Sequence, residues 1–384
     1  MRILLLHNHY SVNGGEDIVF YNELNALKNK LGEDNVFEYQ VGVNNISNWH
    51  ILKSILFSRK QYKIVYDLIK KYNIDIVHIH NYFPILTVSV FKAAKDAGAK
   101  LVHTAHNYRL WCIAGNFYRS KVGICTSCVK KGGWLSGIKY KCYRNSRIQS
   151  IAAQAAFWFY RKNNLLNYVD KIITLTHFQQ DHLIRIGVAK NKLFLKPNMV
   201  NFDCIAISPN DKQDYLYVGR LDESKGIELL LSTWVKLPNH FKLTIVGSGI
   251  LGDALIKRYN QSNIEFLGEL PSLEIERLMK KARYTIQPSL LFETFGLTII
   301  ESMRVGTPVI GLNIGTRPEL IQNMKTGFIS TPENLLETIL NADKFDNYDA
   351  MSKNAQLFTL EFLPDILIDR QMTLYSDLIS NSLN

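Results

Sequence analysis

The chain has 384 residues, of which 47% are hydrophobic and 21% charged, the composition of a soluble globular protein. This length exceeds one ordinary core and predicts two domains. No apolar run approaches the roughly 18–20 residues that cross a bilayer, and the N-terminal MRILLL is too short for a signal peptide, so we expect a cytoplasmic protein.

Positive charge is concentrated in the first half of the chain, although the total net charge is only +11. Residues 1–196 contain 28 Lys and Arg against 11 Asp and Glu, a net of +17, whereas residues 197–384 contain 17 against 23, a net of −6. A basic half beside an acidic half indicates a polyanionic partner on one side only. Anionic lipid, a pyrophosphate-linked acceptor and nucleic acid all fit this description.

The chain opens in the manner of a nucleotide-type α/β unit. Residues 1–7 are predicted to form a buried strand, and the loop behind it contains Gly14 and Gly15. A helix is expected over 17–30. Its apolar face consists of Ile18, Tyr21, Leu24, Leu27 and Leu31.

Two segments of the first half mix apolar residues with basic or aromatic ones. The segment 49–71 is typical either of an ordinary surface helix or of an amphipathic helix drawn to an anionic membrane surface. The segment 150–163 is predicted to be a helix with one side in the core and an aromatic side that faces lipid.

Two histidines stand at the ends of predicted strands. His80 ends the strand 75–80, and His106 follows the strand 100–105. Because ligands of open α/β sheets bind at the carboxyl ends of the strands, both are candidate site residues. His78 and His103 lie inside the strands, and we expect them to be core histidines.

A predicted insert, residues 108–147, contains four of the five cysteines. Cys125 and Cys128 form a C-x2-C pair that lies between Cys112 and Cys142. Four thiolates can hold a structural zinc ion, and a glycine-rich segment of this size lacks the apolar residues for its own core. The spacing is not that of a ribbon with two C-x2-C knuckles, and packed thiols are the alternative. Disulfides are not expected in a reducing compartment.

The α/β pattern restarts in the second half, behind a predicted hinge that consists of Lys196-Pro197-Asn198 and then the polar stretch 208–214. A strand over 214–218 ends in Gly219, and Arg220 and Lys225 bracket the turn into the next helix. Two cations at such a turn can bind a diphosphate while the helix N-terminus adds its dipole.

Two further predicted strands of the second half lead into possible ligand contacts. The strand 241–246 is followed by Gly247, a turn that lets a nucleotide approach the backbone. The strand 263–268 contains Leu267.

Two glutamates eight positions apart, Glu293 and Glu301, flank the start of a predicted helix near Gly296. The glycine and the first free N–H groups of the helix suit a phosphate, so the backbone of Phe295, Leu297 and Thr298 belongs to the candidate site. Glu301 could accept hydrogen bonds from ribose hydroxyls, and Glu293 could hold the hydroxyls of a sugar. The alternative is a capped amphipathic helix with two solvated glutamates.

The segment 291–306 resembles the E-x7-E signature of family 4 retaining glycosyltransferases, and the segment 219–226 matches the same family. The resemblance covers most of the chain. It implies an α/β chain of GT-B fold, two Rossmann-like parallel-sheet domains that face each other across a cleft. We expect an acceptor-side domain over 1–196, a nucleotide-sugar domain over 197–365 and a final helix, 366–384, that packs back on the first domain.

The resemblance also assigns roles to residues that spacing alone leaves open. It implies that His106 contacts the donor sugar, that Gly14 and Gly15 lie near the donor phosphates, and that the strand with Leu267 presents its backbone to the base. His106 is followed by Asn107, where many relatives have aspartate, so the role of Asn107 is open.

The implied activity is transfer of a sugar from a nucleoside-diphosphate sugar, with UDP-sugar favoured and GDP-sugar as the alternative. The catalytic residues would be Glu293, His106, Arg220 and Lys225. The two cations would replace a catalytic metal, because they stabilise charge on the leaving diphosphate. The acceptor would be a polyprenyl-pyrophosphate-linked glycan of O-antigen or capsule assembly, bound at the inner face of the cell membrane.

Two other functions fit parts of the sequence. A sugar-nucleotide epimerase can share the fold and needs neither a membrane nor an acceptor. A zinc-containing nucleic-acid-binding protein would explain the basic half and the cysteines, and would show a steep salt dependence. The set of Arg220, Lys225, Glu293 and Glu301 argues against that second alternative, so we expect no nucleic acid partner.

Overall fold

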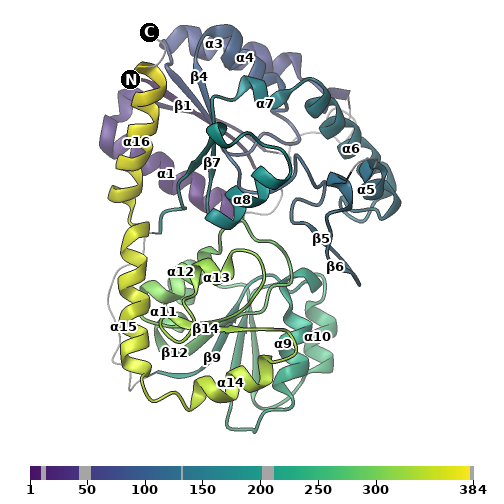
Figure 1. Ribbon diagram of the computed structural model, residues 1–384, viewed down its shortest axis with the longest axis vertical. Coiled ribbons are helices and arrows are strands. Elements are labelled where there is room, and N and C mark those ends of the chain that lie inside the picture. The colour runs from purple at the N-terminus through teal and green to yellow at the C-terminus, as the bar shows by residue number, and fades with distance from the viewer. Residues whose placement is uncertain (10–13, 43–52, 131–132, 201–211, 381–384) are drawn as a thin grey trace. The chain divides into compact units, whose positions relative to one another are not determined.

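The structure, a computed structural model, describes residues 1–9, 14–42, 53–130, 133–200 and 212–380 (Figure 1). The chain divides into two compact units. Unit 1 comprises Met1–Phe117, Thr126–Met199 and Pro364–Asn384. Unit 2 comprises Tyr118–Cys125 and Val200–Leu363.

The core of unit 1 is a six-stranded sheet in the order β2-β1-β3-β4-β7-β8, with every pair parallel. The strands are β1 (Ile3–His9), β2 (Val36–Gly42), β3 (Ile76–Ile79), β4 (Lys100–Thr104), β7 (Lys171–Thr174) and β8 (Leu193–Leu195). From β1 the chain first adds β2 on one side and then β3 on the other. The carboxyl ends of β1, β3 and β4 therefore form the edge where a ligand of such a sheet binds.

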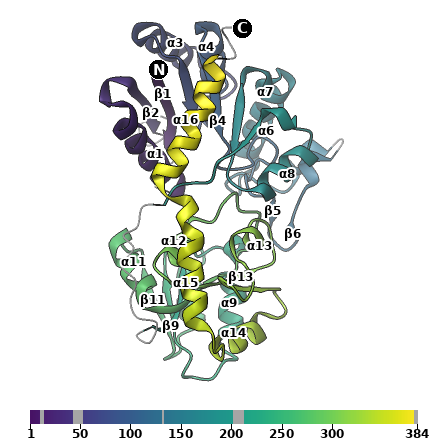
Figure 2. The same cartoon turned by 60° about the vertical axis from the view of Figure 1, so that its left-hand side comes forward.

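The helices of unit 1 pack on both faces of this sheet, as parallel strands require. They are α1 (Gly15–Leu31), α3 (Arg59–Tyr72), α4 (Ser89–Ala97), α5 (Ser136–Lys139), α6 (Arg147–Lys162), α7 (Leu165–Tyr168), α8 (His177–Arg185) and α16 (Pro364–Ser380). The C-terminal α16 lies along α1 (Figure 2).

The predicted apolar face of α1 was partly wrong. Ile18 and Tyr21 are 49% and 43% exposed. The side that packs into the unit is offset by about one residue and carries a carboxylate. Its buried members are Asp17, Val19, Phe20, Glu23, Leu24 and Leu27. The apolar period alone could not place this face, because Glu23 is buried only through partners from distant parts of the chain.

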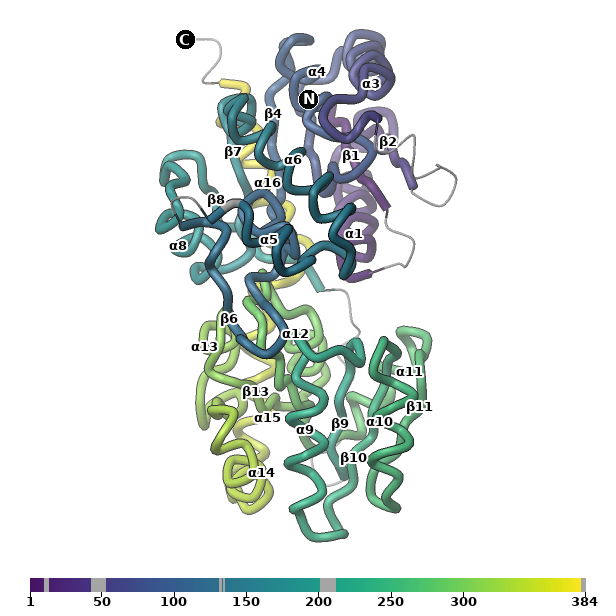
Figure 3. Tube along the Cα trace, turned by 90° about the vertical axis from the view of Figure 1, so that its right-hand side faces the viewer, coloured from purple at the N-terminus to yellow at the C-terminus, as the bar shows by residue number. Residues whose placement is uncertain are grey.

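The two amphipathic segments differ in what they expose. Of the segment 49–71, residues 49–52 lie outside the described residues, and the rest contains α3. The apolar side of α3 packs on α4 (Figure 3), so the exposed side is charged. In contrast, α6 exposes Ile148, Ile151 and Trp158 at 75%, 48% and 45%.

The core of unit 2 is a second parallel sheet, in the order β11-β10-β9-β12-β13-β14. The strands are β9 (Gln213–Val218), β10 (Leu243–Val246), β11 (Ile264–Gly268), β12 (Ala282–Gln287), β13 (Val309–Leu312) and β14 (Gly327–Ser330). The helices are α9 (Ile227–Trp234), α10 (Gly252–Arg258), α11 (Ser272–Lys281), α12 (Leu297–Arg304), α13 (Arg317–Leu320), α14 (Leu335–Asp343) and α15 (Tyr348–Phe358). Fully buried Trp234 and Tyr284 belong to its main cluster.

A short antiparallel hairpin of the insert, β5 (Tyr118–Arg119) and β6 (Gly123–Ile124), is grouped with unit 2. Residues 208–211 of the predicted hinge lie outside the described residues. None of the described helices is both long enough and apolar enough to cross a membrane. Two parallel sheets covered by helices confirm the predicted α/β class.

Candidate active site

The site of unit 2 forms where the order of its strands reverses. From β9 the chain continues to β10 and β11 on one side, and then crosses to β12, β13 and β14 on the other. In open parallel sheets, ligands bind outside the carboxyl ends of the strands at such a reversal, here beside the loops after β9 and β12. Lys225 follows β9, and Glu293 follows β12.

These two predicted residues, 68 positions apart, are in direct contact. Lys225 Nζ donates to Glu293 Oε1 at 2.8 Å, and Ser289 Oγ donates to the same oxygen at 2.8 Å. Burial by itself would raise the pKa of Glu293, but the charges of Lys225 and Arg317 outweigh it and lower that pKa to about 2. Glu293 is therefore an anion at neutral pH, held in a fixed orientation.

Arg317 is a buried cation behind Glu293 that the sequence analysis did not single out. The residue is only 1% exposed. Its Nε donates to the Leu312 carbonyl at 3.1 Å, and its Nη2 donates to the carbonyl of Ser289. Burial lowers the pKa of Arg317 to about 10, and Glu293 opposes that shift. Arg317 thus ties the end of β13 to the loop that carries Glu293.

Arg220 behaves differently from Lys225. Its side chain is 68% exposed, and Nη2 lies 3.0 Å from Asp222 Oδ2. Asp222 also caps the turn, because its side chain accepts from the Lys225 N–H at 3.1 Å. An exposed guanidinium at a strand end is accessible to a soluble ligand.

The glycines of this region allow close approach of backbone segments. A Cβ on Gly226, at φ +71°, would meet the Pro288 carbonyl oxygen at 2.0 Å, and one on Gly247, at φ +132°, would meet the Gly219 oxygen at 2.0 Å. Only glycine fits at 226 and 247, so both turns are built into the sheet edge.

The helix predicted near Gly296 is present as α12, with Gly296 as its N-cap at φ +134°. Leu297 and Thr298 form its first turn, so their N–H groups point out of the helix start. Glu301 is half-buried in the second turn, and burial raises its pKa to about 7.

The other predicted contacts of unit 2 lie on neighbouring elements. Leu267 is half-buried near the end of β11, and Gly268 accepts from the Gly247 N–H at 2.7 Å. The Phe295 side chain is buried, and its carbonyl accepts from Thr316 Oγ1 at 2.7 Å.

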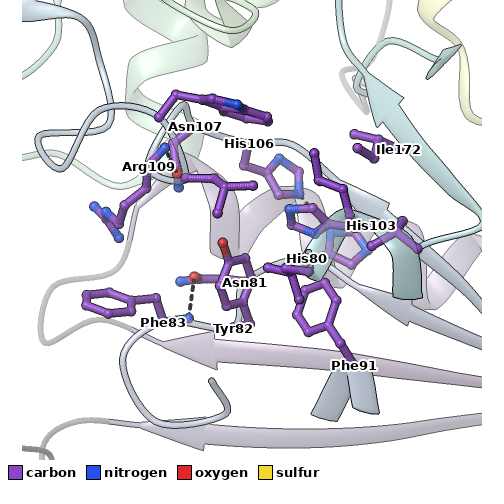
Figure 4. A pocket seen from close by; sticks show the side chains of 15 residues that line it. His80, Asn81, Tyr82, Phe83, Phe91, His103, His106, Asn107, Arg109 and Ile172 are labelled. Carbon is purple, nitrogen blue, oxygen red and sulfur yellow. Dashed lines mark hydrogen bonds between the residues drawn. The ribbon is translucent and has the colours of Figure 1, made fainter. Parts of the chain in front are cut away.

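In unit 1, His106 lines a pocket at the ends of β3 and β4 (Figure 4). The rings of His80, His103 and His106 lie close together there, and Asn107 and Arg109 also line the pocket. His80 and His106 are 2% and 8% exposed, and their ring nitrogens lie 2.9 Å apart.

Helix α1 brings two carboxylates to this pocket region. Asn107 Nδ2 donates to Glu16 Oε1 at 3.0 Å, and His80 Nε2 lies 3.2 Å from Glu23 Oε1. Glu16 and Glu23 are seven positions apart, hence on one face of the helix. Gly14 and Gly15 cap and begin this helix, and the Gly14 N–H donates to Asp17 at 2.7 Å.

Two groups of side chains in the described residues bring three metal-ligating atoms within 4.8 Å of one another. They are His7, His9 and Asp17, and Glu23, His78 and His80. In both groups the carboxylate lies within hydrogen-bond distance of the imidazoles. Neither group contains a cysteine.

Four buried residues in and behind the candidate sites were not predicted from the sequence: Ser289, Arg317, Glu23 and Lys196. Lys196 precedes a proline at the predicted hinge and gave no signal of burial, yet it is 2% exposed. Arg317 offered one usable signal, since an arginine between a glycine turn and a proline directly behind a buried strand lies at the carboxyl edge of the sheet.

Similarity to known proteins agrees with this architecture. A family model described as "Glycosyltransferase Family 4" matches residues 31–203, and one described as "Glycosyl transferases group 1" matches residues 205–357. An uncharacterized 41.2 kDa protein in the cps region of Klebsiella pneumoniae is 26% identical over 210 residues, 50% of this chain and 57% of that protein. O-antigen chain mannosyltransferase C of Escherichia coli is 28% identical over 178 residues, 44% of this chain and 47% of that protein.

This chain thus spans about half the length of these curated relatives. Among solved structures, Anabaena HepE in complex with UDP is similar in fold, with a TM-score of 0.68 at 16% identity, over 98% of this chain and 100% of that chain. The two family models together extend over residues 31–357, and both units of the structure are parallel α/β units. The chain belongs to glycosyltransferase family 4 and has the GT-B fold.

Proposed function

We propose that this protein transfers a sugar from a nucleoside-diphosphate sugar to a polyprenyl-pyrophosphate-linked glycan, with retention of anomeric configuration, in the assembly of a surface polysaccharide. The observation that carries the proposal is the Lys225–Glu293 contact at the strand reversal of unit 2. It joins a phosphate-binding cation to a carboxylate that binds hydroxyls, the two groups that a sugar diphosphate requires.

The donor we favour is a UDP-sugar, with a GDP-sugar as the alternative. Anabaena HepE, a protein of similar fold that was solved in complex with UDP, supports this choice. In the proposed complex Arg220 and Lys225 bind the diphosphate, and the N–H groups at the start of α12 add to its binding. Glu301 accepts from the ribose, Glu293 orients the sugar, and the backbone of β11 near Leu267 faces the base.

The chemistry we propose is electrostatic. As the glycosidic bond to phosphate breaks, negative charge grows on the leaving diphosphate, and two fixed cations stabilise that charge without a divalent metal. The leaving phosphate itself takes the proton of the acceptor hydroxyl on the same face. His106 of unit 1 contacts the sugar. The name of O-antigen chain mannosyltransferase C supports an O-antigen-type acceptor.

We further propose that residues 1–196 bind the acceptor at the inner face of the cell membrane, and that α6 supplies the contact. Its exposed Ile148, Ile151 and Trp158 recur at helical spacing, and Lys162 Nζ lies 4.9 Å from the Trp158 ring. Residues 97–169 contain twelve Lys and Arg and no Asp or Glu. An apolar stripe inside a purely basic segment suits anionic lipid, at about 1 kcal/mol per cation.

Sedimentation with vesicles tests the membrane contact. Ile151→Gln combined with Trp158→Gln should release the protein from vesicles that contain phosphatidylglycerol, whereas Leu273→Gln, which removes an apolar residue 70% exposed on α11, should not. Equal binding of both variants, or no binding by the unchanged protein, would overturn this part of the proposal.

The structural zinc also stays a proposal. Cys112 is buried, and Cys125, Cys128 and Cys142 are half-buried. Elemental analysis of the purified protein should find zinc in stoichiometric amount, lost in Cys125→Ser and Cys128→Ser but not in Cys204→Ser, whose cysteine lies outside the insert. A zinc-free protein that folds and is active would refute it.

Nucleotide binding is the first test of the whole proposal. Thermal unfolding is followed with UDP, GDP, dTDP and CMP, for the unchanged protein, Glu301→Gln and Arg220→Ala. Ligand at one hundred times its dissociation constant stabilises by about 2.7 kcal/mol. One diphosphate should stabilise the unchanged protein, and the stabilisation should be much smaller in both variants.

The matched control is Arg258→Ala, which removes an equally exposed arginine that pairs with Glu228 on α9. It should respond to the nucleotide as the unchanged protein does. No stabilisation by any nucleotide would leave the Lys225–Glu293 pair without its ligand.

A further inference from the structure

A line of buried polar side chains leads from α1 to His106. Glu23 and His80 are 1% and 2% exposed, and His106 is 8% exposed. His80 Nε2 lies 3.2 Å from Glu23 Oε1, and His80 Nδ1 lies 2.9 Å from His106 Nε2. The two imidazoles stack with centroids 5.1 Å apart, and Figure 4 shows them side by side.

The Glu23 end of this line is an ionised carboxylate. Burial by itself would raise the pKa of Glu23, but the charge of Lys196 opposes that shift, and the pKa lies well below its usual range. Lys196 Nζ lies 2.6 Å from Oε2, and the Gln371 amide of α16 donates to Oε1 at 2.7 Å. His78 Nδ1 also lies 2.9 Å from Oε1. A carboxylate in this state only accepts hydrogen bonds.

The two imidazoles are neutral. Burial lowers the pKa of His80 to about 3, and burial holds the pKa of His106 well below its usual range. A neutral imidazole has one nitrogen that donates and one that accepts. The only freedom that remains is which nitrogen of each ring carries the proton.

We infer that Glu23 sets the tautomer of His106 through His80. Because Glu23 only accepts, His80 must carry its proton on Nε2, and its Nδ1 must then accept. His106 Nε2, which faces that Nδ1, must therefore carry the proton of its own ring. If His80 carried its proton on Nδ1 instead, its unprotonated Nε2 would face the Glu23 carboxylate. Electrostatic repulsion excludes that arrangement. His106 is thereby fixed with Nδ1 as its accepting nitrogen.

The consequence for catalysis rests on the proposed function. In the proposed complex Nδ1 of His106 accepts a hydrogen bond from a sugar hydroxyl, and a ring in the other tautomer would instead present a donor to that hydroxyl. Glu23 and His80 are thus positioning residues, which act on the sugar only through His106. Hydrogen bonding also explains why Glu23, His78 and His80 lie as close together as the ligands of a metal ion.

Nuclear magnetic resonance of the full-length chain with ¹⁵N-labelled histidine tests the tautomer directly, because ring ¹⁵N shifts and couplings tell which nitrogen carries the proton. His106→Gln assigns the signal, and His240→Gln, at an exposed position, is the matched control. We expect His106 and His80 both protonated on Nε2 at neutral pH. A His106 ring protonated on Nδ1 would overturn the inference. This readout needs no substrate and stands whether or not the proposed function fails.

Two substitutions at position 80 test the effect on sugar transfer. His80→Gln keeps an amide that can donate to Glu23 and accept from His106, whereas His80→Phe fills the space without either group. The hydrogen-bond partners that orient a metal-ligating histidine are typically worth 10–100-fold in affinity or activity, and we expect an effect of that order at His106. We expect kcat to fall by about that factor in His80→Phe and to recover to within a few-fold in His80→Gln, with unaltered nucleotide binding.

The second experiment has a clear contrary result. Equal loss in both variants, with His106 still protonated on Nε2, would show that position 80 matters only for packing. Absence of transfer by the unchanged protein with every nucleotide sugar tested would instead refute the proposed function and leave the tautomer result intact.

Discussion

Glu301 is the residue whose charge state should be visible at physiological pH. Burial raises its pKa to about 7 from a usual 4.5, whereas the ribose contact that we propose for it is strongest with the ionised carboxylate. We expect the preferred nucleotide to bind roughly tenfold more weakly at pH 6 than at pH 8, as a single group of pKa 7 requires.

Glu301→Gln is the control for this titration. Calorimetry gives the nucleotide affinity of both proteins as a function of pH. The nucleotide phosphate titrates in both cases, so the difference between the two curves reports the titration of Glu301. The free protein should show the opposite trend in stability. Because the folded-state pKa is raised, the stability contributed by Glu301 is full below 4.5 and is lost as pH rises through about 7. Parallel curves for both proteins would contradict the assignment.

Asn107 stands where the family resemblance leads us to expect aspartate, and the nitrogen of its side-chain amide can account for the difference. Its amide donates to Glu16 Oε1 at 3.0 Å, and burial raises the pKa of Glu16. Asn107→Asp would set two carboxylates against each other. We expect a loss of about 1–3 kcal/mol at pH 8, shrinking as pH falls and one carboxyl takes up a proton.

Denaturant unfolding at several pH values checks this prediction. The double variant Asn107→Asp, Glu16→Gln restores a donor–acceptor pair and should regain most of the lost stability. If the single variant were as stable as the unchanged protein at pH 8, the contact between Asn107 and Glu16 would not contribute to the free energy of unfolding.

The turn between β9 and α9 shows how an element positions the site. Gly226 has φ +71°, and a Cβ there would meet the Pro288 carbonyl oxygen at 2.0 Å. Gly268 also has φ +71°, but nothing lies within 4 Å of its Cβ position. The pair therefore separates backbone strain from steric overlap.

Gly268→Ala should cost about 1–2 kcal/mol, the usual penalty of a left-handed residue. Gly226→Ala should cost more, because the loop that carries Glu293 has to move away from Lys225. Nucleotide affinity should fall much more in Gly226→Ala than in Gly268→Ala, as measured by calorimetry beside denaturant unfolding. Equal effects at both positions would mean that the overlap is relieved without moving the site.

The sequence predicted most at the level of secondary-structure elements, that is, where strands end and helices begin. The strand ends before Gly219 and His106 and the start of α12 at Gly296 were all predicted from local patterns. The α1 face was misjudged at Ile18 and Tyr21, because a helical period cannot tell a buried glutamate from a solvated one. The packing of α3 on α4, and the exposure of apolar residues on α6, equally depend on neighbours that the period does not contain.

On the scale of the whole molecule, three segments that are distant in the sequence meet in the interior of unit 1. Glu23 of α1 meets Lys196, 173 positions away, and Gln371 of α16, 348 positions away. Lys196→Met leaves the buried carboxylate without its cation, and removal of one partner of such a pair typically costs about 3–5 kcal/mol.

The double variant Glu23→Leu, Lys196→Met removes both charges and should be much closer to the unchanged protein in stability. Denaturant unfolding of the four proteins gives the coupling free energy of the pair. Additive losses would show that the two residues act independently. The surface pair of Lys92 and Asp96 on α4 offers a contrast, since its coupling should stay below about 1 kcal/mol.

The sequence by itself determined the α/β class, and it predicted the residues that we propose for the donor site in unit 2. These follow from short-range patterns, because strands, turns and helix starts are encoded within a few neighbouring residues. Only the tertiary structure decided which of these residues meet. The Lys225–Glu293 contact depends on β9 and β12 being neighbours, and the burial of Lys196, Arg317 and Glu23 depends on strand order and on the return of α16. Such long-range pairings have no local signature, since each partner alone is an ordinary charged residue whose burial is favourable only once the other is in place.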